Sequence, residues 1–235
     1  DGEGHWHATP AESDGGAGTT LEPADLELAP GLALPLAFLA TSGAALSVSA
    51  VSWSWAVSSY RASYEVLLAS KTSELLAATT ATAVTLSGFS PNQASAIVVR
   101  GVNVTGTGGL SPSATRYTLA EAPTALDLLA LSSAAATLFW NGGTNPAGTL
   151  FSLEASASGG AFAVAGTTTG TGLTVAGLSA ATLYEFRVNA LNGDSNPTAY
   201  SNGYSTTTLP ALPGTPGAPS GTAVGVSSVQ WTWSS

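Results

Sequence analysis

Residues 176–192 read AGLSAATLYEFRVNALN, and residues 87–103 read SGFSPNQASAIVVRGVN. The two stretches align without a gap, at an offset of 89 residues. In the later stretch Tyr184, Phe186 and Val188 alternate with polar or charged residues, which is the period of a half-buried β-strand. The chain therefore repeats a β-rich unit, and this internal repeat decides the fold.

Two further anchors extend the repeat. The phrase YTLAEAP at 117–123 returns as TTLPALP at 207–213. A proline precedes a tryptophan by 17 or 18 residues three times, in the pairs Pro35–Trp53, Pro123–Trp140 and Pro213–Trp231. We therefore divide the chain into an acidic N-terminal segment that is either a linker or the end of a preceding module, two full modules, and the opening two strands of an incomplete third module: 1–32, 33–120, 121–210 and 211–235.

Each unit is predicted to consist of short strands joined by turns. Alternating apolar and small polar residues surround Trp53, Trp140 and Trp231, and clusters of Gly, Pro, Asn and Ser separate the alternating segments. The segment 75–83 is rich in Ala and Thr, and we expect an edge strand or a bend there. Units of this length with about seven short strands are typical of an antiparallel, immunoglobulin-like β-sandwich, so the fold class is all-β.

The units resemble tandem fibronectin type III domains of the bacterial surface type. The second unit carries the pattern best, with Trp140 on its second strand, followed by the family's spacing of seven residues toward its end: Leu178, Thr182, Tyr184, Phe186, Val188, Ala190 and Asn192. The resemblance implies that Tyr184 ties the corner before the sixth strand to the backbone. It also implies that Trp53, Trp140 and Trp231 are core residues. The first unit departs from the pattern, because Ser95 stands where the corner tyrosine is expected and Gly101 where the family has alanine.

The last strands raise a question of their own. Two strands that bear Trp231 and Trp233 cannot bury those rings alone, and an isolated hairpin is marginal in water. We therefore expect further chain or another subunit to cover them, and both tryptophans are candidates for assembly. One form of this hypothesis is strand donation between subunits.

Composition excludes several classes of function. The 235 residues include 5 Lys and Arg against 14 Asp and Glu, so no basic patch can neutralise several phosphates and nucleic-acid binding is not expected. There is no cysteine, which excludes disulfides and thiolate chemistry. The most apolar stretch, 29–40, is too short to span a membrane and contains two prolines. Only 8% of residues are charged, which favours surfaces that are packed against copies or covered by glycans.

Candidate chemical sites are few. His5 and His7 would share one face of an extended strand and are weak candidates for a metal site, but no further ligands return to them. No nucleophile and base can be paired, so we expect no catalytic residues, no cofactor and no enzyme activity. Asn103 begins the one Asn-x-Thr sequon and is a candidate glycosylation site. Exposed tryptophans as a platform for sugars are the alternative to core positions.

These observations predict a secreted structural protein. Our main hypothesis is a subunit of an extracellular filament, sheath or cell-surface array on a prokaryotic cell, which acts by assembly with copies of itself. The alternative is a set of spacer or carbohydrate-binding modules in a larger secreted enzyme or adhesin, with a polysaccharide or cell-surface partner. No membrane insertion is expected in either case.

Overall fold

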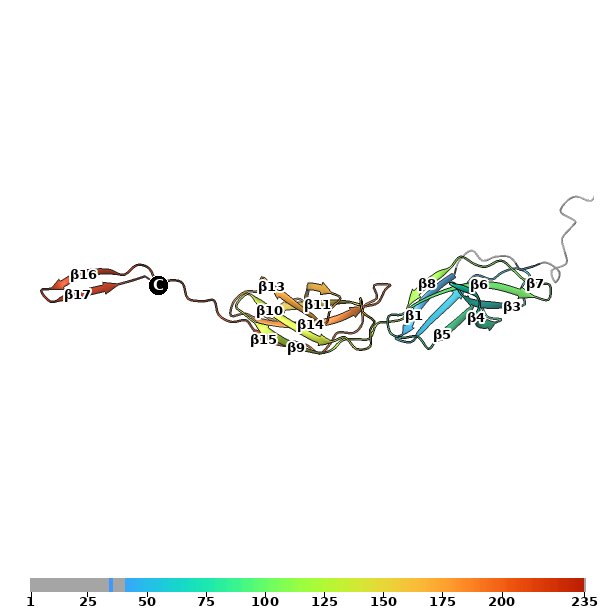
Figure 1. Ribbon diagram of the computed structural model, residues 1–235, viewed down its shortest axis with the longest axis horizontal. Coiled ribbons are helices and arrows are strands. Elements are labelled where there is room, and N and C mark those ends of the chain that lie inside the picture. Colours follow the sequence, from blue (N-terminus) through green and yellow to red (C-terminus); the bar gives the residue numbers. More distant parts are fainter. Residues whose placement is uncertain (1–33, 36–40, 235) are drawn as a thin grey trace, which may run out of the picture.

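The computed structural model describes residues 34–35 and 41–234, and every regular element in this part of the chain is a β-strand (Figure 1). The strands form two sandwiches, module 1 and module 2, and then a separate hairpin at the end of an extended segment. The predicted all-β class and tandem sandwiches are confirmed. The acidic N-terminal segment 1–32 lies outside the described residues, and so do His5 and His7.

Module 1 packs a three-stranded sheet against a larger one. Its strands are β1 (Thr41–Ser47), β2 (Ala50–Trp55), β3 (Ser63–Leu68), β4 (Lys71–Thr79), β5 (Ala83–Ser87), β6 (Ala94–Asn103), β7 (Gly106–Thr107) and β8 (Ala114–Tyr117). One sheet has the order β1-β2-β5, and the other the order β4-β3-β6 with β7 and β8 both paired to β6. The segment 75–83 supplies the end of β4, which pairs only with β3 and is therefore an edge strand.

Module 2 repeats this arrangement. Its strands are β9 (Thr124–Leu131), β10 (Ala135–Asn141), β11 (Leu150–Ala157), β12 (Ala163–Thr168), β13 (Gly172–Ala176), β14 (Leu183–Leu191) and β15 (Tyr204–Thr207). The first, second and fifth strands form one sheet, in the order β13-β10-β9, and the others form the second, in the order β12-β11-β14-β15. All pairs are antiparallel.

Each module buries a tryptophan of its second strand between its two sheets. Trp53 is 1% exposed and Trp140 is 3% exposed, and each belongs to its own apolar core. Trp140 packs against Phe151 with ring centroids 5.7 Å apart, while Trp55 contacts Tyr64 edge to face. The cores do not merge, so each sandwich is stabilised chiefly by its own apolar burial.

The last two described strands are not part of a sandwich. Strands β16 (Ser220–Gly225) and β17 (Ser228–Thr232) pair only with each other. The sequence predicts Trp231 as a core residue; among the described residues no second sheet lies over its ring, and Trp231 is 60% exposed. Trp233 is exposed to a similar degree.

Candidate functional site at the junction between the modules

The two sandwiches meet end to end through hydrogen bonds that start from one asparagine. Asn92 lies in the loop before β6 with a positive φ of 49°, a conformation that asparagine adopts more readily than most residues. Its Nδ2 donates to Thr149 Oγ1 at 2.9 Å, and its Oδ1 accepts from the backbone N–H of Gly193 at 2.7 Å. Because Thr149 and Gly193 both belong to module 2, this single side chain binds two loops of the other sandwich.

A second set of contacts runs from the loop after β14 back to the end of β8. Buried Asn192 donates from Nδ2 to the carbonyl oxygen of Thr118 at 3.0 Å, and Asp194 Oδ2 accepts from the backbone N–H of Tyr117 at 2.9 Å. The ring of Tyr117 covers Gly193 so closely that a Cβ there would lie 2.5 Å from it. Only glycine fits beneath this ring without a shift.

The connecting segment is itself tied to module 2. The backbone N–H of Glu121 donates to Asn145 Oδ1, and Asn145 Nδ2 donates back to the carbonyl of Glu121. The carboxylate of Glu121 accepts from both the backbone N–H and the hydroxyl of Thr144. These bonds hold the pKa of Glu121 below its usual value. The linker is therefore fixed to module 2 by the polar contacts of Glu121.

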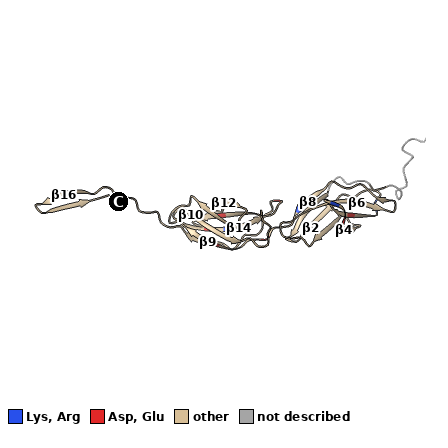
Figure 2. Cartoon of the chain, viewed as in Figure 1, with Lys and Arg blue, Asp and Glu red and all other residues tan. Residues whose placement is uncertain are grey.

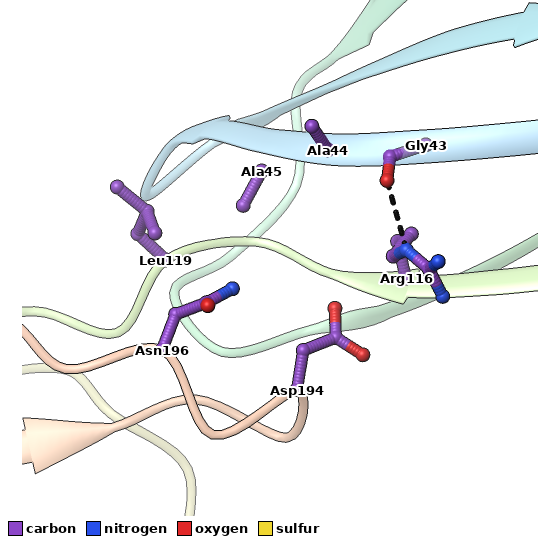
Figure 3. Close-up of a pocket in the computed structure, with 7 residues that line it drawn as sticks. All are labelled: Gly43, Ala44, Ala45, Arg116, Leu119, Asp194 and Asn196. Carbon is purple, nitrogen blue, oxygen red and sulfur yellow. Dashed lines mark hydrogen bonds between the residues drawn. The ribbon is translucent and has the colours of Figure 1, made fainter.

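A cleft of about 560 Å³ opens beside these contacts. Figure 3 shows Arg116 of β8 and Asp194 on its walls, with the backbone of β1 at Gly43 and Ala44 along one side. Arg116 Nε donates to the Gly43 carbonyl at 2.8 Å, and Asp194 is engaged with Tyr117 as described above. The cleft thus presents one cationic and one anionic group, which suits a polar ligand better than an apolar one.

The charged groups of the cleft are engaged with the backbone. Within the described residues there is no group of three or more His, Asp and Glu side chains that could hold a metal ion. Arg116 donates to the Gly43 carbonyl and Asp194 accepts from the Tyr117 backbone N–H, and both histidines of the sequence lie outside the described residues. What the junction can do is fix the angle between two modules and offer a polar cleft.

Charged side chains are distributed unevenly over the modules. Figure 2 shows them scattered and few. Strands β1, β2, β5, β10 and β13 contain none, and β9 contributes only Asp127, so the three-stranded sheets are almost free of charge. Both larger sheets carry a cross-strand ion pair at the same place in the repeat, Glu65 with Arg100 and Glu154 with Arg187, each at 2.7 Å.

The ion pair of module 2 is part of a larger cluster. The guanidinium of Arg187 lies 3.9 Å from the ring centroids of both Phe162 and Tyr200, and the Tyr200 hydroxyl donates to Glu154 at 2.8 Å. Burial raises the pKa of Glu154, but the hydrogen bonds from Tyr200 and Arg187 and the charge of Arg187 outweigh it, so that pKa lies below its ordinary value. The hydrogen bond to Glu154 raises the pKa of Tyr200.

The structure places the sequence-predicted residues apart from the junction. The hydroxyl of Tyr184 accepts the backbone N–H of Ser179 at 3.0 Å, which ties the corner before β14. Asn103 lies in a turn, where Nδ2 donates to the Tyr60 carbonyl and Oδ1 accepts from Thr105 and Gly106. Trp53 and Trp140 lie in the two cores, while Trp231 and Trp233 lie on the hairpin.

Sequence reasoning missed one pair of residues at this corner. Thr208 Oγ1 accepts the backbone N–H of Thr182 and donates to the Ser179 carbonyl, and Thr118 makes the equivalent bonds to Gln93 and Ser90 in module 1. Both threonines are buried. The signal was present, because they lie in the repeated phrases at 117–123 and 207–213.

Strand order and corner together identify the architecture. In both modules the first, second and fifth strands form one sheet and the remaining strands the other, and in module 2 a tyrosine ties the corner before the sixth strand. The fold is fibronectin type III-like. The tandem arrangement predicted from the repeat is thereby confirmed.

Comparisons with known proteins return structures of this kind. No family model and no curated protein matches the sequence. A two-domain fibronectin type III segment of chicken tenascin is 13% identical with a TM-score of 0.44, over 74% of this chain and 98% of its own. The FN1–FN3 domains of chicken CNTN1 are 18% identical with a TM-score of 0.40, over 75% of this chain and 69% of theirs. A domain of human fibronectin type III domain containing protein 3 is 24% identical with a TM-score of 0.36, over 39% of this chain and 88% of its own.

Proposed function

We propose that the chain is a non-enzymatic structural subunit of an extracellular filament, sheath or cell-surface array, outside a prokaryotic cell, and that it acts by assembly with copies of itself. Among the described residues no helix is long and apolar enough to cross a membrane. The proposal needs no cofactor and no nucleic-acid partner.

The observation that carries the proposal is the hydrogen-bonded junction. Two modules joined by a flexible linker have no fixed angle between them. Here the side chains of Asn92 in module 1 and Asn192 in module 2 each bond to the other sandwich. Fixing the angle between neighbouring modules is what a regular array requires of its subunit. The nearly uncharged three-stranded sheets support the same proposal, because surfaces poor in charge associate more readily.

The direct test is the state of association of the full chain. Sedimentation velocity over a wide range of concentration, followed by electron microscopy, should show elongated particles that grow with concentration. A chain that stays monomeric at the highest soluble concentration overturns the proposal.

The junction cleft favours a second candidate function, in which the modules are spacers or ligand-binding units of a larger secreted enzyme or adhesin. The ligand would be a polar oligosaccharide that bears a carboxylate, bound by the guanidinium of Arg116, which lines the cleft. Titration with oligosaccharides of uronic acids, read by NMR shifts of β1 and β8, tests this candidate. Loss of the shifts in Arg116→Gln would support it, and no shifts in the unaltered chain would eliminate it.

A further inference from the structure

An asparagine that is followed by glycine is chemically reactive toward its own backbone. The sequence contains three such pairs, and all of them lie in module 2: Asn141–Gly142, Asn192–Gly193 and Asn202–Gly203. In each pair the backbone nitrogen of the glycine can approach the side-chain carbon Cγ of the asparagine, because glycine has no Cβ to hinder it. Each pair is therefore a candidate site for loss of the side-chain amide as ammonia.

The reaction needs only water and hydroxide ion. The glycine nitrogen gives its proton to hydroxide and bonds to Cγ, which closes a five-membered succinimide ring. The bond from Cγ to Nδ2 breaks, and Nδ2 takes a proton from water and leaves as ammonia. Water then adds to one of the two ring carbonyl carbons, whose bond to the ring nitrogen breaks. The product is aspartate or isoaspartate, so a donor amide becomes a carboxylate that only accepts hydrogen bonds.

Module 1 occupies both reacting nitrogens of the second pair. The attacking nitrogen, the backbone N–H of Gly193, donates to Asn92 Oδ1 at 2.7 Å. The leaving nitrogen, Asn192 Nδ2, donates to the Thr118 carbonyl at 3.0 Å. Asn192 is 4% exposed, and its Oδ1 also accepts two backbone N–H groups of its own loop. While these bonds hold, the side chain cannot turn toward the Gly193 nitrogen.

The other two pairs have no such contact with module 1. Asn141 and Asn202 are both exposed. Asn141 Oδ1 accepts from the Gly143 backbone N–H within its own turn, at 2.9 Å. Asn202 Oδ1 accepts from the Leu126 backbone N–H at 3.4 Å, which is longer than the usual N–H···O bond. One chain thus contains the same reactive pair in a protected and in an unprotected setting.

We infer that Asn192 is a modification site that the junction protects. The hydrogen bonds that module 1 makes to Asn192 and Gly193 keep the asparagine intact, and separation of the modules allows its conversion into aspartate or isoaspartate. The conversion then prevents the joint from forming again, because a carboxylate has no proton to donate to the Thr118 carbonyl and places a negative charge beside that oxygen. The inference concerns two modules of one chain, so it holds or fails independently of assembly.

Peptide mapping by mass spectrometry measures the three rates in one sample. The full chain is incubated in mildly alkaline buffer and digested, and conversion of each Asn–Gly peptide is followed with time. In the unaltered chain we expect Asn192 to react at least about tenfold more slowly than Asn141, because several hydrogen bonds must break before the ring can close. Equal rates at Asn192 and Asn141 overturn the inference.

Two variants at position 92 test whether module 1 supplies the protection. Asn92→Gly removes the acceptor of the Gly193 N–H, and glycine tolerates the positive φ of the loop. We expect conversion of Asn192 to become about tenfold faster in this variant, and that of Asn141 to stay unchanged. An unchanged rate at Asn192 in Asn92→Gly contradicts the inference.

The matched control is Asn92→Asp. Its carboxylate still accepts from the Gly193 N–H but has no amide to donate to Thr149, and aspartate also tolerates a positive φ. Asn192 should therefore react as slowly as in the unaltered chain. Equal acceleration in Asn92→Asp and Asn92→Gly would mean that the bond to Gly193 gives no protection, and the inference would fall.

The effect on the joint is tested with Asn192→Asp, which places the carboxylate there from the start. Because the carboxylate still accepts the two N–H groups of its loop, module 2 should unfold at nearly the same denaturant concentration. NMR residual dipolar couplings should give two alignment tensors, one for each sandwich. A single common tensor would overturn the one-way opening of the joint. The rates at Asn192 test the protection whether or not this variant folds.

Discussion

At the scale of single residues, one buried hydroxyl in each module ties the last strand to the corner before the sixth strand. In module 2 this threonine is joined by Tyr184, whereas in module 1 the tyrosine position holds Ser95 and the threonine has no such support. The family resemblance indicated the tyrosine, but it did not indicate the threonine, because a threonine near a strand end is equally explained by β-propensity. The contacts, rather than the residue type, reveal its role.

We expect Thr118→Val to destabilise module 1 by about 1–3 kcal/mol, because valine leaves the backbone N–H of Gln93 and the carbonyl of Ser90 without their partner. Denaturant unfolding followed through the tryptophans of module 1 measures this. The control is Thr85→Val, which removes an exposed hydroxyl on β5. Equal stability of the two variants would contradict the role given to Thr118.

Glu154 gives a prediction about acid stability. Its folded pKa lies below the unfolded value, so its contribution is fully present above the unfolded pKa, near 4.5, and is lost as pH falls through the folded pKa. Glu154→Gln should therefore flatten the fall in the free energy of unfolding of module 2 below about pH 4.5. Chemical denaturation at a series of pH values measures the slope. An unchanged slope in Glu154→Gln would refute the assignment.

At the scale of elements, the alternation of apolar and polar residues predicts the strands that have one buried face. The alternation around Trp53 and Trp140 predicts their strands, since one face of each is covered. The same alternation around Trp231 predicts the strand β17, but the Trp231 ring is exposed here, because a pattern records which side chains would face a sheet and not whether that sheet is present. The junction was not predicted at all, because its asparagines and glycines are also ordinary turn residues.

Gly43 and Gly221 each lie beneath a tryptophan ring, and substitution of each by alanine should show whether that ring is fixed in a core. Gly43→Ala should destabilise module 1 by about 1–3 kcal/mol, because the new methyl group overlaps a Trp53 ring that is fixed in the core. Gly221→Ala meets Trp231 in the same register, but that ring is exposed and can move, so we expect no change in the unfolding of either sandwich. Thermal unfolding monitored by near-UV circular dichroism compares the two variants. A similar loss in both, or in neither, would contradict this account.

At the scale of the whole molecule, the two connections differ in kind. Between module 1 and module 2 the chain is bonded from both sides, through Asn92, Asn192 and Glu121. Between module 2 and the hairpin, residues 209–219 are rich in proline and extended (Figure 1). The hydrogen-bonded joint fixes the angle between the two modules, whereas the extended proline-rich segment fixes the spacing between module 2 and the hairpin. The first arrangement suits a stiff repeating unit, and the second places the hairpin at a distance from module 2 (Figure 1).

The stiffness of the first joint can be removed at one residue. Asn92→Gly deletes both side-chain bonds to module 2, and glycine accepts the positive φ, so the backbone of the loop is not strained. We expect NMR residual dipolar couplings to give a common alignment tensor for both sandwiches in the unaltered chain and two different tensors in Asn92→Gly, with little change in the stability of either module. Asn141→Gly is the control, because the Asn141 side chain bonds only to Gly143 within its own turn. A single tensor that persists in Asn92→Gly would mean that the asparagine does not fix the angle, and stiffness would then have to come from the contact of Tyr117 with Gly193.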